Sequence, residues 1–330
     1  MPWLRIYFTD ADIARTRMKL GIDLMWEIVS SAHILQHSDG VLSFGAWRRG
    51  VRELAGSDPD LRMAVRTIVT AAPHAAYFPD LLTPARDVSG IDEGIDAILS
   101  ISSWRFREEI GRIRPPAGAA ATWLDDLARG RLVALRRLGE ALRVFFRSAI
   151  EPHLPTIEDG VRTDAAVGIQ QYLHCGAEGL LHGLGRTTRW EPPVLSVAYP
   201  HDRDLYLEGR GLVLIPCYFA LHHPVALADP RLRPVLAFPI RTESRLLAGG
   251  RTDGDHVTAL LGVTRALILR SVVGGSTTTG LARVVGVAPA TVSHHTRILR
   301  EAGFITTERH ENFARHLITP LGLQVLSAHR

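Results

Sequence analysis

Four side chains between positions 291 and 297 form a pattern that suits contact with nucleobases. Thr291, Ser293, His294 and Arg297 would present hydroxyl, imidazole and guanidinium groups from the first turns of an expected helix. Base edges in the major groove of duplex DNA offer donors and acceptors for such groups. These four residues are therefore the candidate base-reading set.

A second group of basic side chains follows closely in the sequence. Residues 305–308 and 314–319 alternate like two paired strands around the polar turn 309–312. This hairpin would place Arg309 and Arg315 near phosphates, with His310 as a further DNA contact.

Local signals predict the elements that must position these groups. Ser276 and Thr277 are placed to cap a helix that buries Leu281, Ala282 and Val285 on one face. Gly286 can supply the positive φ that ends this helix, and Pro289 suits the first turn of the next. We therefore expect two helices joined by a short, rigid turn.

The second helix needs a buried face to lie against the first. Val292, His295, Leu299 and Ala302 recur at helical spacing and are expected to face inward, before Gly303 ends the helix. His295 is therefore expected to be a hydrogen-bonded structural histidine rather than a base reader.

Charge separates this segment from the rest of the chain. Residues 256–330 contain eight arginines and three glutamates, a net charge of +5, whereas the preceding residues have a net charge of −1. A basic module on a near-neutral body is typical of nucleic-acid binding.

Residues 276–325 resemble the winged helix-turn-helix of the ArsR family of bacterial transcriptional regulators. The matching motifs are Gly262-Val263-Thr264-Arg265, Leu281-Ala282, Thr291-Val292-Ser293-His294-His295, Leu299-Arg300-Glu301-Ala302-Gly303 and Thr319-Pro320-Leu321-Gly322. The resemblance implies a homodimer on a palindromic operator in double-stranded DNA. It also implies that a terminal helix at 320–329 and a first helix near His256 form much of the dimer interface.

Two positions depart from that family. The helix before the recognition helix contains no cysteine, so thiolate metal sensing is excluded there. Ala288 stands where the family usually has Ser, so a helix N-cap worth roughly 1 kcal/mol is missing.

Composition limits the class of the whole chain. With 330 residues and 46% hydrophobic content, about two domains are expected. Two cysteines fit a reducing cytoplasm without a disulfide framework. No secretion signal is evident, and the longest apolar run, residues 211–221, is too short to cross a bilayer. We expect a cytoplasmic protein with no membrane partner.

The remaining sequence predicts an α+β protein in which a mostly helical N-terminal domain carries a small, mostly antiparallel sheet. Expected helices are 24–35, 44–54, 61–70, 91–101, 123–150 and 164–184; expected strands are 4–8, 194–199, 204–208, 211–219 and 235–240. Gly209-Arg210-Gly211 looks like a hairpin turn. The expected domains are residues 1–245 for sensing or assembly, a linker at 246–255, and the DNA-binding module at 256–330.

The N-terminal region resembles the upstream domain of actinobacterial ArsR-like regulators. The resemblance lies in residues 8–17, Trp26-Glu27-Ile28, Arg189-Trp190-Glu191-Pro192-Pro193 and Gly209-Arg210-Gly211-Leu212. It implies no particular ligand or reaction.

The size of this region suggests a second task, for which a small organic effector is the leading candidate. Aromatic side chains that could contact the effector are Trp26, Trp47, Tyr77, Trp104, Trp123, Tyr172 and Trp190. The alternative is that most of these aromatic side chains are simply core residues.

The alternative is an enzyme or metal-binding domain fused to a DNA-binding module. Its suggestive residues are His174, Cys175, His182, His201, Asp202, Cys217, His222 and His223. Their intervals match no compact zinc motif, and no phosphate-binding glycine loop or nucleophile elbow is present. We therefore expect no catalytic residues, no metal site and no cofactor, and favour a transcriptional regulator, with repression as the expected action.

Overall fold

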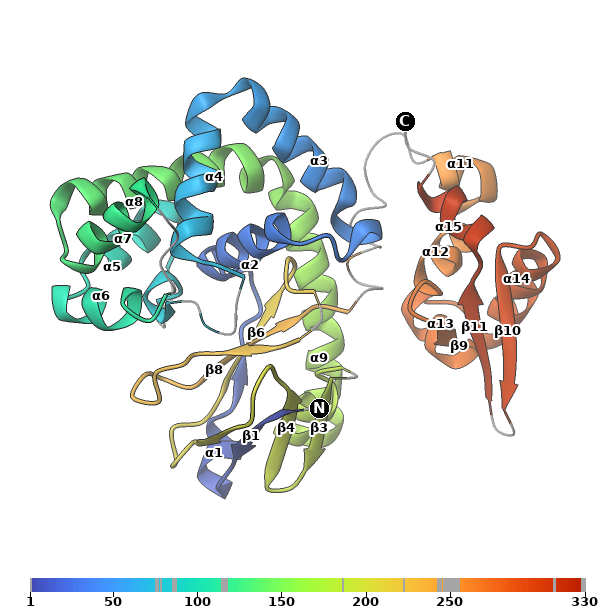
Figure 1. Ribbon diagram of the computed structural model, residues 1–330. Coiled ribbons are helices and arrows are strands. Elements are labelled where there is room, and N and C mark those ends of the chain that lie inside the picture. Colours follow the sequence, from blue (N-terminus) through green and yellow to red (C-terminus); the bar gives the residue numbers. More distant parts are fainter. Residues whose placement is uncertain are drawn as a thin grey trace. The chain divides into compact units, whose positions relative to one another are not determined.

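The computed structural model describes residues 2–74, 77, 79–84, 88–113, 118–185, 187–221, 223–241, 245, 256–310 and 313–327. The chain divides into two compact units, Met1–Ile240 and Arg241–Arg330. Each unit is described by itself (Figure 1). The predicted linker at 246–255 lies outside the described residues.

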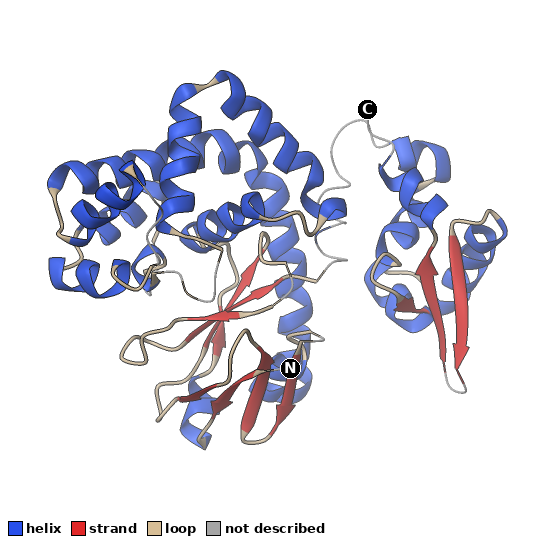
Figure 2. Ribbon diagram, viewed as in Figure 1, coloured by secondary structure: helices blue, strands red, loops and turns tan. Residues whose placement is uncertain are grey.

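Helices are gathered at one end of the first unit and strands at the other (Figure 2). The helical end consists of α2 (Leu24–Gln36), α3 (Val41–Ser57), α4 (Pro59–Ala71), η1 (Asp80–Leu82), α5 (Ile91–Leu99), α6 (Ser103–Ile110), α7 (Ala119–Ala128) and α8 (Leu132–Phe145). Local chemistry sets some of the starts. Asp58 accepts hydrogen bonds from the backbone N–H of Asp60 and Leu61, and Pro59 occupies the first turn of α4.

The prediction of one long helix over 123–150 is wrong. Helix α7 ends at Ala128 and α8 begins at Leu132, because Gly130 adopts a φ of 68° between them. An apolar stripe that continues across this break hid the turn from periodicity. The sequence also failed to predict α6.

One long helix connects the helical end with the strands. After the short turns η2 (Phe146–Ile150) and η3 (Glu151–His153), α9 spans Leu154–His182, so it begins earlier than predicted. Cys175 and Gly176 have non-helical backbone angles and kink it. Figure 1 shows α9 running alongside the strands.

The strands of this unit form two four-stranded sheets, each with mixed strand directions. The first sheet contains β3 (Thr188–Glu191), β4 (Val194–Ala198), β1 (Trp3–Tyr7) and β5 (Arg203–Tyr206), in that spatial order. The second contains β2 (Arg17–Met18), β6 (Val213–Cys217), β8 (Val235–Pro239) and β7 (Val225–Ala226). The α+β class is confirmed, with two sheets where a single small sheet was expected.

Burial patterns show how the layers stack. In β1 buried and half-buried residues alternate, so only one face of the first sheet is covered. In β8, Val235 and Ala237 join the core of the helical end, whereas Leu236 and Phe238 join the core shared with the first sheet. The second sheet is therefore covered on both faces, which explains its continuous apolar runs.

Gly209-Arg210-Gly211 is not a hairpin turn, contrary to prediction. It follows β5 of the first sheet and leads into β6 of the second, with φ of 82° at Gly209 and 70° at Gly211. The positive φ angles of the two glycines let the chain pass from the first sheet to the second. Beside them lies α1 (Asp10–Arg15), whose Asp12 accepts a 2.8 Å hydrogen bond from the Gly211 N–H.

The second unit is a small helical bundle with a three-stranded sheet. Its elements are α11 (His256–Leu261), α12 (Val263–Ser271), β9 (Ser276–Thr277), α13 (Thr278–Val285), α14 (Pro289–Glu301), β10 (Ile305–His310), β11 (Phe313–Ile318) and α15 (Pro320–Ser327). The strand order is β10-β11-β9. This is the predicted winged helix-turn-helix architecture.

The turn between α13 and α14 forms as its sequence predicts. The Thr277 hydroxyl caps α13 by accepting a 3.1 Å hydrogen bond from the Gly280 N–H. Gly286 adopts the left-handed conformation, and its N–H bonds to the Ala282 carbonyl. Pro289 begins α14. Among the described residues no helix is both long enough and apolar enough to span a membrane.

Candidate nucleic-acid interface

Helix α14 presents the predicted base-reading residues on one half of its surface. Ser293, His294 and Arg297 are exposed, and Thr291 is half-buried. The opposite half carries the buried residues Val292, Thr296 and Leu299. Because the polar half is not needed for the core, it is available for contact with another molecule.

One detail of the predicted inward face is wrong. Thr296 is buried, and Ala302 is exposed. The Thr296 hydroxyl can be buried because it donates a 2.9 Å hydrogen bond to the Val292 carbonyl of its own helix. Ala302 lies just past the last helical turn, where helical spacing no longer applies.

His295, predicted to face inward, lies at the edge of the buried face and is half-buried. Its Nδ1 is buried and has no hydrogen-bond partner within the described part of the chain, so the expected bond at that atom is not seen. Burial, followed by the neighbouring His294 and Arg265, lowers the pKa of His295. Protonation of the ring is therefore disfavoured, and the ring lies beside the exposed His294 at a centroid distance of 5.3 Å.

The two wing arginines lie on opposite faces of the hairpin. Arg309 pairs with Ala314, and Arg315 pairs with Glu308 one position along the ladder. Side chains of neighbouring pairs point to opposite faces of a hairpin. Arg309 is exposed, whereas Arg315 is half-buried. A Cβ added at Gly275 would lie 2.8 Å from Arg315 Nε, so the guanidinium packs on that glycine. The His310 side chain lies outside the described residues.

The structure adds a residue that the sequence did not single out. His316 of β11 is only 3% exposed, and its two ring nitrogens each lie 3.0 Å from a hydroxyl, those of Thr278 and Thr307. The signal in the sequence is a histidine at an inward position of an alternating strand.

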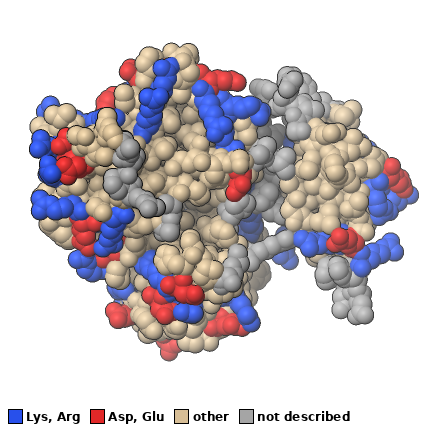
Figure 3. Space-filling model, in the orientation of Figure 1, with Lys and Arg blue, Asp and Glu red and all other residues tan. Residues whose placement is uncertain are grey.

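Charge supports the same surface. The described arginines 283, 297, 300 and 309 of this unit are exposed. On the face visible in Figure 3, basic side chains lie at the margin of this unit, and the middle carries uncharged groups. An exposed polar helix flanked by arginines suits a ligand that combines phosphates with base edges.

Residues 262–307 match the family model for bacterial regulatory protein, arsR family. This segment is an ArsR-type helix-turn-helix. It extends from the turn before α12 into β10 and contains α13 and α14 complete. Comparisons of the chain with curated proteins and with solved structures give no match. The matched segment supports a DNA-binding transcriptional regulator.

The aromatic residues proposed for an effector do not come together. Trp26 and Trp123 belong to the core of the helical end, Trp47 packs against that core, and Trp190 belongs to the core between the sheets. Trp104 and Tyr172 are 55% and 50% exposed, respectively. Tyr77 lies near α6, where its hydroxyl donates to the Glu109 carbonyl at 3.3 Å. No one cavity is therefore indicated by this set.

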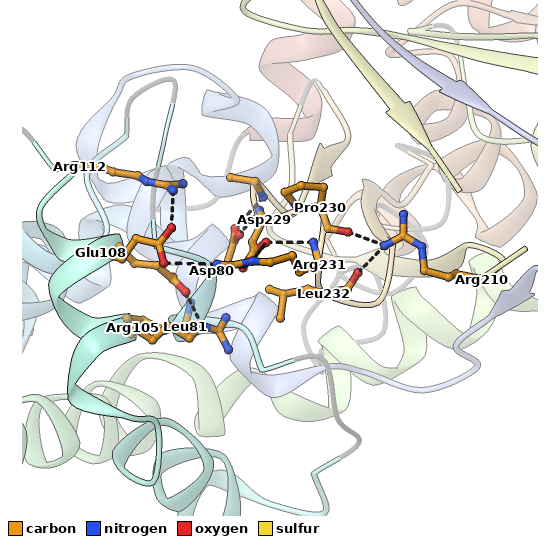
Figure 4. Close-up of polar contacts among 12 residues, drawn as sticks. Asp80, Leu81, Arg105, Glu108, Arg112, Arg210, Asp229, Pro230, Arg231 and Leu232 are labelled. Atoms are coloured by element: carbon orange, nitrogen blue, oxygen red, sulfur yellow. Dashed lines mark hydrogen bonds and ion pairs between the residues drawn. The ribbon is translucent and has the colours of Figure 1, made fainter. Parts of the chain in front are cut away.

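A polar network in the N-terminal unit contains two buried acids, Asp80 and Glu109, and Asp80 holds the loop between β7 and β8 (Figure 4). Asp80 accepts hydrogen bonds from the N–H of Ala228 and of Asp229, and Glu109 accepts from the Leu81 N–H and from Arg105 Nε. Burial is the main cause that raises the pKa of both carboxyl groups. A general acid needs such a shift, but both oxygens of each group are already engaged in holding the backbone or Arg105. We interpret the network as structural.

The histidines and cysteines of the enzyme alternative are scattered. Cys175 is exposed at the kink of α9, whereas Cys217 is buried against Ser30 and Glu27, 3.3 and 3.4 Å from their oxygens. Burial raises the pKa of the Cys217 thiol well above its usual value, which makes it a poor nucleophile. In the described ranges, no three His, Cys, Asp or Glu side chains form a group that could hold a metal ion. His222 lies outside those ranges.

Proposed function

We propose that the protein is a sequence-specific transcriptional repressor that binds a palindromic operator as a homodimer. The observation that carries this proposal is the exposed polar half of α14, held against α13 by a buried opposite half. The ArsR-type segment at 262–307 supports it. A dimer bound over a promoter would exclude RNA polymerase without the help of any other protein.

Each residue of the interface has a proposed role. Thr291, Ser293, His294 and Arg297 would read base edges in the major groove, with Arg297 suited to a guanine. Arg309, His310 and Arg315 would contact the phosphate backbone from the wing. Because Arg315 packs beside Gly275, Arg309 is the stronger candidate of the two described wing arginines.

The dimer would use α11 and α15, whose apolar side chains are exposed in the isolated unit. Leu260 is 71% exposed and Leu321 is 48% exposed. Such side chains favour burial against a second copy. The N-terminal unit would set the geometry of the dimer and respond to a small organic effector. With duplex DNA as its partner, the protein would act in the cytoplasm.

Selection of bound fragments from genomic DNA tests the function directly. We expect enrichment of sites with two-fold symmetry, which then provide the operator for quantitative binding. Arg297→Ala should reduce the preference for operator over random DNA by roughly 5- to 150-fold, the value of about 1–3 kcal/mol for one good base contact.

Arg283→Ala is the matched control, because Arg283 is equally exposed but lies on α13. It should leave the preference unchanged. Absence of any enriched fragment would contradict the proposed function, and an unchanged preference in Arg297→Ala would remove that residue from the reading set. A change of melting temperature on adding candidate metabolites tests the effector.

A further inference from the structure

A buried imidazole joins the wing to the helix-turn-helix. The His316 ring bridges the hydroxyl of Thr278, the first residue of α13, and the hydroxyl of Thr307 on β10, at 3.0 Å on each side. His316 itself lies on β11, where its backbone pairs with Ser276 of β9. One side chain therefore links both strands of the wing to the helix that supports α14.

The neutral ring satisfies this arrangement fully. One ring nitrogen donates its proton to one threonine hydroxyl, and the other accepts a proton from the second hydroxyl. Each bond of this kind stabilises the fold, and more stability is lost when a buried partner is left unpaired. The bridge is thus strong enough to decide how firmly a short two-stranded wing is held.

The surroundings of the ring disfavour a second proton. Burial, and then the positive charge of Arg300 on α14, lower the pKa of His316. Thr278, Thr307 and Ser276 offer only neutral hydroxyls. Arg309 shares the ring's face of the hairpin, and the nearest acid on β10, Glu308, lies on the reversed face opposite Arg315.

We propose that His316 positions the wing on the helix-turn-helix and that the joint loosens when the ring is protonated, so that operator binding weakens as the solution becomes acidic. The proposal rests on the proposed function, DNA binding. Its site is the Thr278–His316–Thr307 joint, and the ligand that reports on it is duplex DNA.

The direction of the effect follows from the depressed pKa of folded His316. Its contribution to wing stability is complete above the usual value near 6.5 and is lost as the pH falls through the folded value, so the joint predicts weaker binding in acid. His295, whose pKa is also lowered, lies outside the joint and is present in every variant compared below, so the difference between variants reports on His316.

The test measures operator affinity of the full chain between pH of about 7.5 and about 5.5 by fluorescence anisotropy. The wild type should lose roughly fivefold in affinity, the equivalent of one lost hydrogen bond of the joint. His316→Gln should bind within about threefold of wild type at neutral pH and lose clearly less affinity in acid, since an amide supplies one donor and one acceptor but does not titrate. Parallel pH profiles for the two proteins would overturn the proposal.

Two threonine variants form a matched pair if His316→Gln does not fold. Thr307→Val keeps the shape, removes one partner of the ring and should weaken binding several-fold at neutral pH. Thr306→Val changes the exposed neighbour on the same strand and should have no effect. Equal affinities for Thr307→Val and Thr306→Val would also overturn the proposal.

A DNA-free measurement separates failure of the joint from failure of the proposed function. Hydrogen exchange of β10 and β11 amides at pH of about 5.5 should show lower protection factors in the wild type than in His316→Gln, with α12 unchanged. If the wild type binds no DNA at any pH, the proposed function fails, and the amide protection alone decides on the joint. Equal protection in the two proteins contradicts it.

Discussion

Buried acids in the N-terminal unit hold chain segments that are far apart in the sequence. Glu27 of α2 is 1% exposed and accepts hydrogen bonds from the backbone N–H of Tyr218 at 2.7 Å and of Phe219 at 3.0 Å. Asp12 makes the equivalent contact with Gly211. Each carboxylate thus accepts hydrogen bonds from backbone N–H groups at a strand end or a turn, where no neighbouring strand supplies an acceptor.

This role explains motifs that the sequence marked without a function. The segments around Phe8, Trp190 and Gly209 are far apart in the sequence, and they lie together in the structure. The Phe8 N–H bonds to the Pro193 carbonyl, the Phe8 and Trp190 rings lie 5.1 Å apart, and Arg15 donates to the Gly209 carbonyl. The contacts of these segments stabilise the fold of the N-terminal unit.

Glu27→Ala should destabilise the N-terminal unit by about 3 kcal/mol. Two buried N–H groups would lose a charged acceptor, and each such bond contributes about 1.5–3 kcal/mol. The free energy of unfolding in urea, followed by tryptophan fluorescence, measures the loss. Glu53→Ala, at an exposed position of α3, is the control and should change stability by less than about 0.5 kcal/mol. Similar values for both variants would refute this role for Glu27.

Elements whose signals are local were predicted well from the sequence. Gly286 and Pro289 fix the turn between α13 and α14 through backbone conformation alone, and the structure confirms both. The break at Gly130 was missed because flanking apolar residues continue the helical period. The second sheet could not be foreseen as a separate layer, because a strand covered on both faces has no alternation to reveal its register.

The candidate site divides in the same way. The exposed half of α14 follows from helical periodicity, and the structure shows Ser293, His294 and Arg297 exposed there. Their role in reading bases stays a prediction. Thr296 was missed because a hydroxyl bonded to its own helix looks polar in sequence and is satisfied in the fold. The His316 bridge depends on three elements meeting, and only tertiary structure brings Thr278 and Thr307 to one ring.

Helix α14 begins without a side-chain cap, which gives a stabilising substitution. Ala288 is the N-cap, has extended backbone angles, and makes no side-chain hydrogen bond. Ala288→Ser should stabilise the DNA-binding unit by about 1 kcal/mol, because a serine oxygen can accept from a free N–H of the first turn. Thermal unfolding of this unit measures the change. Ala290→Ser, inside the first turn, is the control; an equal gain there would show that capping is not the cause.

At the scale of the whole molecule, charge and fold divide the chain at nearly the same place. The excess of basic over acidic side chains lies in residues 256–330, and the boundary between the two compact units falls after Ile240. If only the second unit meets DNA, the salt dependence of binding must be set by arginines of that unit. Each phosphate contact changes the slope of log affinity against log salt by about 0.9.

Arg309→Ala should therefore lower the steepness of that slope by about one while leaving the preference for operator over random DNA intact. Arg309 is exposed at the wing, where it would touch phosphate and not base edges. Arg49→Ala removes an equally exposed arginine of α3 in the other unit and should leave the slope unchanged. Anisotropy titrations across a range of salt concentrations make the comparison. A slope that falls in Arg49→Ala would mean that the N-terminal unit also lies on the DNA, since counterion release depends only on which charges meet phosphates.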